Sequence, residues 1–581
     1  MTCRTRTSWH RCGSWASTCC PSSPGEASTE RRAPSQHTRG GEMKLRRSEW
    51  GERPHRRRAG VALSLVVVAA IVAACGGDDG ESGSGTTSTV DQAVRSAVEG
   101  QLDEATASTE ASQVPTSMEE WEALWAEERA AIVERISSDG GGTSADGTTA
   151  TGPGGFTIDL SACPAGWGNT EGVSLTSFKL GFPSPQSGPV ADAGNLPKAA
   201  EAILAAYARE HAFTDSEGVD RSAEIVVRDD MYDPSRTVAL VDELIDSEKV
   251  FALTVIGQSN FLRTYEKLNQ RCIPMPFNAE GHPASGDPVN HPWSSNFLLL
   301  GSTEALIWGT YIEEHLDEWG GKVKVASLVA TNDTGMSYHR GFENFIAQSP
   351  RKADIEYVSE MIEPGTPTIK DPMTTLAAQQ PDIFIYMGPA SVTCTQAIIE
   401  VAEAGLKDEL TAAFQPGNCK ASSFIGAERV GGDGSAADGW MIVGGGWKDF
   451  NSEALDDDPW VAWAREQLAA AGYDYRSSAS LGQGTATGWM LAQALQVAGA
   501  LPGGLTRSNF ALAARFFDMT HPGLVPGISV GMDGADDAYL LEGSDISRWE
   551  AAGQRWVIQS TVDLSGTTPP CAWDVAATAC R

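Results

Sequence analysis

Nine residues that could hold a small solute each come directly after an apolar stretch of the chain. Gln258 and Ser259, for example, follow the apolar run 251–257. Most of the nine are uncharged, which suits a neutral or zwitterionic solute held by a few directional hydrogen bonds and one aromatic wall. Two are acidic and would favour a cationic group on the solute. The predicted ligand-binding residues are Ser187, Gln258, Ser259, Asn278, Glu280, Asp333, Ser391, Gln415 and Trp447.

The sequence lacks the motifs of several other chemistries. It has no His-Glu-x-x-His zinc motif and no P-loop, and the glycine run 444–446 lacks the Lys-Ser/Thr that a phosphate cradle needs. The cysteines form no Cys-x-x-Cys pair, and His282 and His291 are typical loop residues rather than metal ligands. We therefore expect no metal, no cofactor and binding without turnover. A secreted enzyme is the less favoured alternative.

The stretch 223–260 predicts the elements that position Gln258 and Ser259. An apolar run at 225–227 is followed by Asp233 as a helix N-cap and Pro234 at the first helical position. Apolar residues then recur at helical spacing up to Ile245, and the second apolar run is 251–257. A strand, a helix and a strand that is apolar on both faces imply a parallel sheet covered on both sides. Ligands bind at the carboxyl ends of such strands.

Other stretches predict more strands of the same kind. They are 177–182, 273–277, 323–330, 355–361, 381–388, 410–414 and 439–443, with 525–529 and 555–559 as the last strands.

Several of these stretches resemble the type I periplasmic binding proteins, and among them the leucine/isoleucine/valine-binding branch that serves ABC importers. The resemblance rests on Asp-Asp-Met-Tyr-Asp-Pro at 229–234, on the helix and strand after it and on Ser-Gly-Pro at 187–189, and it covers about residues 174–566. It implies an α/β fold of two doubly wound parallel-sheet lobes, joined by crossover strands, that close on ligand by hinge motion.

The resemblance also implies roles for particular positions. In amino-acid binders of this family, a carboxylate near the start of the helix after strand 381–388 pairs with the ligand ammonium, and this chain has Thr393 near that place. Where some of them have an aromatic residue in the first loop, this chain has Ala193. These departures disfavour a plain amino acid as the ligand.

The expected domain organisation alternates between the two lobes. We expect a leader and signal peptide at 1–75, a flexible linker at 76–116, an amphipathic helix at 117–136 and a second linker at 137–173. Lobe 1 would comprise 174–298 and 426–530. Lobe 2 would comprise 299–425, and at 531–581 the chain would return to lobe 2 and end in a C-terminal tail.

The first 75 residues read as a lipoprotein leader, with Met43 as the expected true start. Arginines at 56–58 precede an apolar run at 59–74, which is too short for a comfortable membrane span. Small residues then precede Cys75, as in the bacterial lipobox. This pattern implies lipidation of Cys75 and a lipid anchor in the membrane.

The N-terminal extension contains one predicted helix between two spacers. Ser117 and Glu120 form a capping box, and Trp121, Trp125 and Ile132 recur at helical spacing. We expect this apolar stripe to dock on the protein's own domain rather than on a partner. The flanking segments are rich in Gly, Ser and Thr, which predicts flexible linkers.

The formal net charge of the 581-residue chain is −33. Residues 1–74 carry 13 Lys and Arg against 5 Asp and Glu, so the remainder carries −41. A body this acidic is repelled by nucleic acid, and we expect no nucleic-acid partner.

Six cysteines remain after the leader, and six cysteines allow 15 pairings. Cys394 lies in the first turn of a predicted helix and Cys419 in the loop after the next strand, so neighbouring parallel strands would bring them together. Cys571 and Cys580 are close in sequence, which leaves Cys163 for Cys272. We predict these three disulfides.

The sequence thus predicts a monomeric, lipid-anchored binding protein on the outer face of the cell membrane. It would deliver a small polar solute, such as a branched-chain amino acid, an amide or a related compound, to ABC permease subunits. A sensory binding subunit without a transporter is the alternative.

Overall fold

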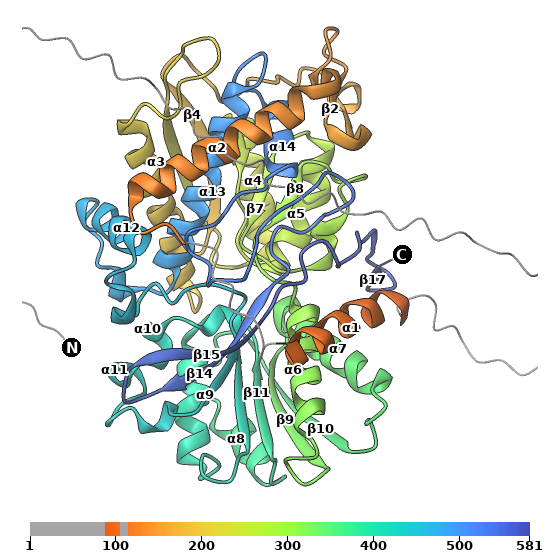
Figure 1. The fold of residues 1–581 in the computed structure, drawn as a ribbon, viewed down its shortest axis with the longest axis vertical. Helices are drawn as coiled ribbons and strands as arrows, with labels where there is room; N and C mark the ends of the chain where they lie inside the picture. Colours follow the sequence, from red (N-terminus) through yellow and green to blue (C-terminus); the bar gives the residue numbers. More distant parts are fainter. Residues whose placement is uncertain (1–87, 105–113, 581) are drawn as a thin grey trace, which may run out of the picture. The chain divides into compact units, whose positions relative to one another are not determined.

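Two mainly parallel sheets, each at the centre of one lobe, form the framework of the computed structural model (Figure 1). The structure describes residues 88–104 and 114–580. The chain divides into two units, Met1–Glu81 and Ser82–Arg581, and every described residue belongs to the second. The expected leader and Cys75 lie outside the described residues. None of the described helices is long and apolar enough to cross a membrane.

Lobe 1 is built on parallel strands, of which β4 (Ser177–Ser184) and β5 (Ser222–Asp229) are long and the others short. β5, β4 and β6 (Ala252–Leu253) pair in that order, and β7 (Met275–Asn278) pairs with β8 (Ser294–Asn296). A parallel bridge between Ile256 and Ala279 links β6 to β7. β6, from the run predicted to be apolar on both faces, is buried, whereas β5 is a half-buried edge strand. The parallel direction of the predicted βαβ unit is confirmed.

Helices cover both faces of this sheet, as predicted. α3 (Leu196–Arg209), α13 (Ser480–Ala500) and α14 (Arg507–Arg515) share a core with Phe178 and Phe182 of β4. α4 (Pro234–Asp246) and α5 (Gln258–Gln270) pack on the other face. α4 begins where predicted, because the Asp233 side chain accepts a hydrogen bond from the Ser235 N–H at 2.8 Å.

Lobe 2 contains one continuous sheet of seven strands. Its parallel strands are β10 (Ile355–Ile362), β9 (Val323–Ala330), β11 (Ile383–Met387), β12 (Ala412–Pro416) and β13 (Met441–Val443). β14 (Ser544–Glu550) and β15 (Arg555–Val562) complete it antiparallel, and Figure 1 shows these blue C-terminal strands beside the others. β14 was not predicted, and the strand predicted at 525–529 does not form.

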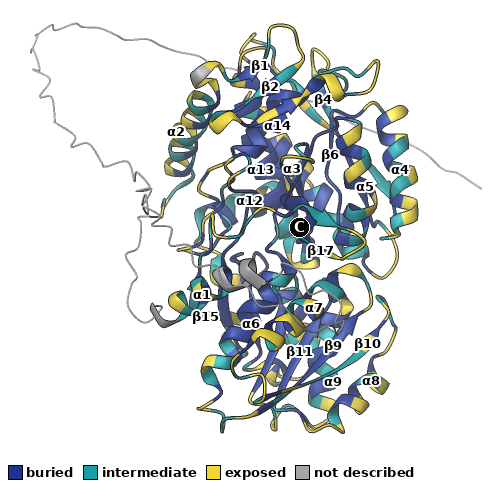
Figure 2. Ribbon diagram, turned by 90° about the vertical axis from the view of Figure 1, so that its right-hand side faces the viewer, coloured by how far each residue is buried: buried dark blue, intermediate teal, exposed yellow. Residues whose placement is uncertain are grey.

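The apolar residues of β9 alternate between two cores. Val325 and Val329 pack with α6 (Gly301–His315) and α7 (Asp333–Gln348), whereas Ala326 and Leu328 pack with α8 (Lys370–Ala377) and α9 (Val392–Glu403). Figure 2 shows the buried residues gathered on the sheets and on the inward sides of the helices. Each lobe is therefore doubly wound.

The crossings between lobes fall later in the chain than predicted. β13 pairs with β12, so lobe 2 extends to Val443 and not to residue 425. Residues 531–541 stay in lobe 1, because Val530 bridges Leu541 and Met532 donates to the carbonyl of Phe517 at 2.7 Å. Strand pairing across the sheet decided both boundaries, and local sequence does not reveal it.

Both N-terminal spacers contain regular structure that was not predicted. α1 (Ser88–Glu104) packs on α6 and β15 within the expected linker 76–116. β1 (Gly142–Thr143), β2 (Thr149–Thr151) and β3 (Thr157–Asp159) form an antiparallel sheet within the expected linker 137–173. This small sheet packs through Phe156 on Phe516, with ring centroids 5.7 Å apart.

The predicted amphipathic helix is α2 (Met118–Ser137), and it docks on lobe 1. Trp125 is fully buried, with its ring 5.2 Å from that of Trp489 and 6.0 Å from that of Trp460. The prediction that its apolar stripe covers its own domain is confirmed.

Three disulfides join the six cysteines in the predicted pairs. They are Cys163–Cys272, Cys394–Cys419 and Cys571–Cys580, with sequence separations of 109, 25 and 9 residues. The last closes a hairpin of β16 (Trp573–Asp574) and β17 (Ala579–Cys580), which returns the chain to lobe 1. There the Cys571 N–H donates to the carbonyl of Gly286 at 2.6 Å.

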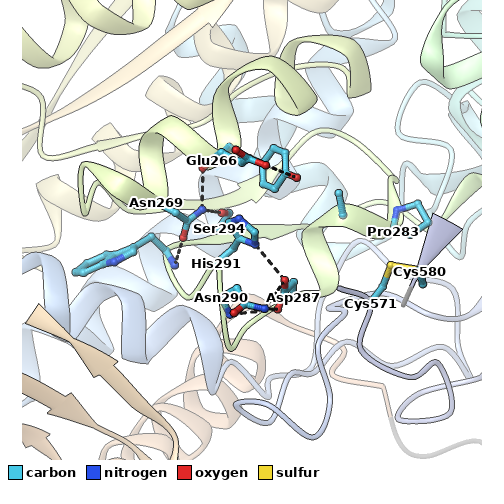
Figure 3. Close-up of polar contacts among 12 residues, drawn as sticks. Glu266, Asn269, Pro283, Asp287, Asn290, His291, Ser294, Cys571 and Cys580 are labelled. Atoms are coloured by element: carbon cyan, nitrogen blue, oxygen red, sulfur yellow. Dashed lines mark hydrogen bonds and ion pairs between the residues drawn. A yellow bond between two sulfur atoms is a disulfide. The ribbon is translucent and has the colours of Figure 1, made fainter. Parts of the chain in front are cut away.

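Side-chain hydrogen bonds also fix the loop between β7 and β8 (Figure 3). Asn269 of α5 donates to Ser294 and accepts from the backbone N–H of Trp293. Asp287 accepts from the Asn290 amide at 2.9 Å. These bonds hold the loop that leads into the first crossing between the lobes.

Candidate functional site

A cleft of about 800 Å³, counting its open mouth, lies between the carboxyl ends of the strands of the two lobes. Lobe 1 contributes Tyr232 after β5, Gln258 after β6 and Glu280 after β7. Lobe 2 contributes α6, α7 and the loops after β11 and β12. The crossing segments line its side through Leu298, Leu299, Gly444 and Gly445. This is the edge where ligands bind in open α/β sheets.

Three of the nine predicted residues line this cleft: Gln258, Glu280 and Trp447. Each carries a buried polar atom without a hydrogen-bond partner, namely Gln258 Oε1, Glu280 Oε1 and Trp447 Nε1. Unsatisfied buried polar atoms cost about 1–3 kcal/mol each. A solute that supplied their partners would recover that cost.

Local backbone geometry brings Gly257, the residue before Gln258, against the ring of Tyr232. Gly257 has φ +92°, and a Cβ there would lie 2.4 Å from the Tyr232 ring. Only glycine combines this positive φ with so close an approach. Tyr232 itself has φ +61°.

Ser259 and Asp333 do not line the cleft but join the two lobes at its rim. The backbone N–H of Asp333 in lobe 2 donates to Ser259 Oγ in lobe 1 at 3.4 Å. A second rim contact places Pro189 of lobe 1 so close to Gly365 of lobe 2 that a Cβ on Gly365 would lie 2.4 Å from Pro189 Cγ. The lobes are therefore closed on one another.

Two predicted residues form hydrogen bonds within their own lobe and do not line the cleft. Asn278 Oδ1 accepts from the Val255 N–H at 2.8 Å, and its amide nitrogen donates to the carbonyls of Met275 and Ser295. This side chain replaces a strand partner, which explains why β6 stops at Leu253 and not at the predicted residue 257. Ser187 is exposed and donates to Asp229 at 2.7 Å.

The other two predicted residues lie beneath the cleft in lobe 2. Ser391 caps α9 by accepting from the Thr393 N–H at 3.2 Å. Gln415 is fully buried and donates to the carbonyl of Cys394 at 2.5 Å, which ties β12 to α9. Neither is among the residues that line the cleft.

Seven polar residues of the cleft were missed: Tyr232, Glu304, Thr334, Tyr338, Asn418, Ser480 and Gln483. Tyr232 lies within the Asp-Asp-Met-Tyr-Asp-Pro motif and could have been found there. Glu304 directly precedes the apolar run 305–308 of α6, and a charged residue at a buried position is a signal in itself. Tyr338 and Asn418 carry no such signal, since an amphipathic helix and a polar loop explain them fully.

Burial controls the protonation of the two acidic residues in the cleft. Burial raises the pKa of Glu280 well above its usual range, although the backbone N–H of His282 favours the ionised form. Burial also raises the pKa of Glu304 to about 8, against the Gly417 N–H and the Tyr338 hydroxyl, which favour ionisation. Glu304 therefore holds a proton at neutral pH in this closed form, and burial favours the neutral form of Glu280 as well.

Basic side chains beside the cleft are already paired. The cleft continues past Trp447 toward Lys420 and Lys448. Lys420 Nζ lies 2.7 Å from both carboxylate oxygens of Asp545, and Lys448 Nζ lies 2.7 Å from Asp458. Neither ammonium group offers an unpaired charge to a solute.

The same Lys420–Asp545 pair fixes the glycine crossing segment. A Cβ on Gly444 would lie 2.4 Å from Asp545 Oδ1 and 2.5 Å from Lys420 Nζ, so a side chain there would break the pair. Gly445 donates to Ser544 Oγ of the neighbouring crossing segment at 2.9 Å. Gly444 and Gly445 thus allow the two adjoining crossing segments to pack closely on each other.

Two specific alternatives, a metal site and a nucleophile elbow, find no support among the described residues. They contain no cluster of three or more His, Cys, Asp and Glu that could hold a metal ion. Residues 527–531 spell Gly-Ile-Ser-Val-Gly, but no strand or helix flanks Ser529 as in a nucleophile elbow. Its hydroxyl donates to Asp563 at 2.9 Å and not to a histidine.

Solved structures share this fold at low sequence identity. A branched-chain amino acid ABC transporter protein from Thermus thermophilus with bound valine matches at a TM-score of 0.55 and 17% identity, over 68% of this chain and 97% of that one. A fatty acid ABC transporter substrate-binding protein from Thermomonospora curvata matches at 0.54 and 16%, over 68% and 95%. A solute-binding protein from Rhodopseudomonas palustris BisB5, in complex with 3,4-dihydroxy benzoic acid, matches at 0.53 and 18%, over 68% and 98%.

A family model gives the assignment that these distant structures support. No curated protein sequence matches this chain. The model of the periplasmic binding proteins matches residues 177–550. This range includes the cleft and both sheets, except for β15, the last strand of lobe 2. The chain therefore belongs to the periplasmic binding protein family, a family of binding proteins and not of enzymes.

Proposed function

We propose that this protein captures a small polar solute outside the cytoplasm and delivers it to an ABC transporter. The observation that carries the proposal is the set of unpartnered polar atoms on Gln258, Glu280 and Trp447, all in one cleft between closed lobes. Apolar neighbours such as Ile256 and Leu299 complete a site that is mostly apolar with a few polar anchors. The solved relatives support a small organic solute, since their ligands include valine and 3,4-dihydroxy benzoic acid.

In this proposal, Cys75 carries a lipid that anchors the protein at the outer face of the cell membrane. The mature protein then acts as a monomer that presents its closed form to the permease. Cys75→Ala should release the protein into the medium or leave an unprocessed precursor. Unchanged membrane association after this substitution would remove Cys75 from the proposal.

Thermal unfolding in the presence of candidate solutes tests the proposed binding. Because only the folded state binds, a ligand at 100 times its Kd stabilises by about 2.7 kcal/mol. We expect amino acids, amides, amines or short polar metabolites to raise the Tm of the parent protein. Trp447→Ala should weaken binding by roughly 1–3 kcal/mol because it removes an aromatic contact. A folded protein that responds to no compound of a broad panel would contradict the proposal.

A further inference from the structure

The charge of the cleft limits which solutes fit it. Among the described residues that line it, the ionisable side chains are Glu280, Glu304, Tyr232 and Tyr338. No Lys, Arg or His side chain lines it, and the nearby Lys420 and Lys448 are paired with aspartates. The cleft therefore provides two acidic groups and no cationic side chain as a counter-ion for an anion.

The two acidic groups come from opposite lobes and are both nearly inaccessible. Glu280 of lobe 1 is 1% exposed; its Oε2 accepts from the His282 N–H at 2.6 Å, and its Oε1 has no partner. Glu304 of lobe 2 is 3% exposed, and its Oε1 accepts from the Gly417 N–H at 2.6 Å. Buried carboxyl groups without a cation are costly, which makes them candidates for a ligand's counter-ions.

Aromatic rings complete the surroundings that an organic cation prefers. Tyr232, Tyr338 and Trp447 line the same cleft. Burial raises the pKa of Tyr232 to about 12, so this side chain is neutral at physiological pH. An ammonium group beside such rings is stabilised by cation–π attraction.

We propose that the solute carries a cationic nitrogen, with Glu280 and Glu304 as its counter-ions, one from each lobe. The proposal rests on the proposed function and names the class of its substrate. A solute that contacts groups of both lobes stabilises the closed form, because opening breaks its contacts with one of them. A solute carboxylate finds no such partner in this cleft.

The groups packed around the two carboxyls set the expected pH dependence. Glu304 faces Tyr338 of α7 and Asp545 of β14, whose charge Lys420 offsets. Glu280 lies near His282 and Tyr539. Burial lowers the pKa of His282 to about 4 and raises the pKa of Tyr539, so neither neighbour is charged at neutral pH. A cation binds the ionised carboxyl groups, so binding releases protons below pH 8. Affinity should therefore rise with pH, by up to about tenfold per unit for each proton released.

Calorimetric titration with matched compounds tests this inference. The probes are benzylamine, benzyl alcohol and benzoate, and isobutylamine, isobutanol and isobutyrate, each titrated at pH 6.5, 7.5 and 8.5 in phosphate and in Tris. An alkylammonium nitrogen stays protonated across this range, as that of lysine does. We expect an amine to bind more tightly than its alcohol and its acid, with affinity rising as pH rises and with proton release.

Isosteric variants assign the effect to the two residues. Glu280→Gln and Glu304→Gln should each weaken amine binding at least tenfold, and Glu304→Gln should also reduce the pH dependence. Glu356→Gln, which neutralises an exposed carboxylate on the edge strand β10, is the matched control and should leave binding unchanged. Circular dichroism and the Tm of each variant establish that it is folded.

Other outcomes separate this inference from the proposed function. Tighter binding of an acid, with affinity rising as pH falls and proton uptake, would overturn the cation and leave the solute-binding role intact. Amine binding that is unaffected by both Glu→Gln substitutions would also overturn it. If the folded protein binds neither amine at any pH but responds to another compound of the thermal-unfolding panel, the cation is overturned and the solute-binding role stands. If it responds to no compound of the whole panel, both proposals are contradicted.

Discussion

The two lobes share a topology but are held together differently. Lobe 2 has seven strands in one sheet, whereas the strands of lobe 1 form a sheet of three and a separate pair. In lobe 1, β6 has two residues and β8 has three, and the β7–β8 pair contains an irregularity. Fewer hydrogen bonds between strands therefore hold lobe 1 together than hold lobe 2.

Buried arginines replace the missing ladder in lobe 1. Arg507 donates to the backbone carbonyls of Phe251, Val250 and Gly168 at 3.0, 2.8 and 3.1 Å. Arg515 donates to the carbonyls of His291, Pro292 and Ser294. Buried carbonyls need donors, and one guanidinium provides five N–H groups in a fixed geometry.

Covalent and aromatic contacts add to the same lobe. The Cys163–Cys272 bond closes a far longer stretch of chain than Cys394–Cys419 in lobe 2. α2 covers lobe 1 with the buried indole of Trp125. The comparison teaches that short strands suffice where buried side chains donate hydrogen bonds to the backbone carbonyls. The disulfide and the aromatic contacts add further stability.

The largest expected effect is the loss of the lobe 1 disulfide. Replacing Cys163 and Cys272 by Ser should lower the free energy of unfolding by about 4–5 kcal/mol, because the bond closes a loop of about 100 residues in the unfolded chain. The same change at Cys394 and Cys419 should cost about 3–4 kcal/mol, since that loop is shorter. Denaturant titration measures both, and equal or reversed losses would break the comparison.

Removal of a buried arginine should have the next largest effect. Arg507→Met keeps most of the side-chain volume but leaves three backbone carbonyls without their donor, which should cost about 3 kcal/mol. Arg351→Met is the control in lobe 2, where a partly exposed ion pair with Asp354 should be worth less than about 1 kcal/mol. Comparable losses in the two variants would show that lobe 1 does not depend on buried arginine.

The smallest expected effect concerns the contact between the lobes. Ser259→Ala removes the acceptor for the Asp333 N–H at the rim, so it should destabilise the closed form and weaken solute binding by about 1 kcal/mol. Ser187→Ala, which removes a hydrogen bond within lobe 1, should leave affinity unchanged. Once a ligand is known, calorimetry on both variants compares them; equal affinities would place the closing contact elsewhere.

Elements whose cause is local were predicted from the sequence. Asp233 and Pro234 start α4 because a cap and a fixed φ act within one turn. The apolar residues of β9 predicted a buried strand because both faces need cover. The pairing of Cys394 with Cys419 followed from the adjacency of consecutive parallel strands.

The tertiary structure alone decided which polar residues line the cleft. All nine predicted residues lie near a strand end, yet Asn278 and Gln415 turn to backbone groups of their own lobe because those groups lack other partners. Glu304 and Tyr338 reach the cleft from helices, since the crossing segments bring α6 and α7 against lobe 1. By itself the sequence determined the fold, the family and the disulfides. The composition of the site was decided by contacts between residues far apart in the chain, where burial and competition for hydrogen-bond partners select which side chains remain available to a ligand.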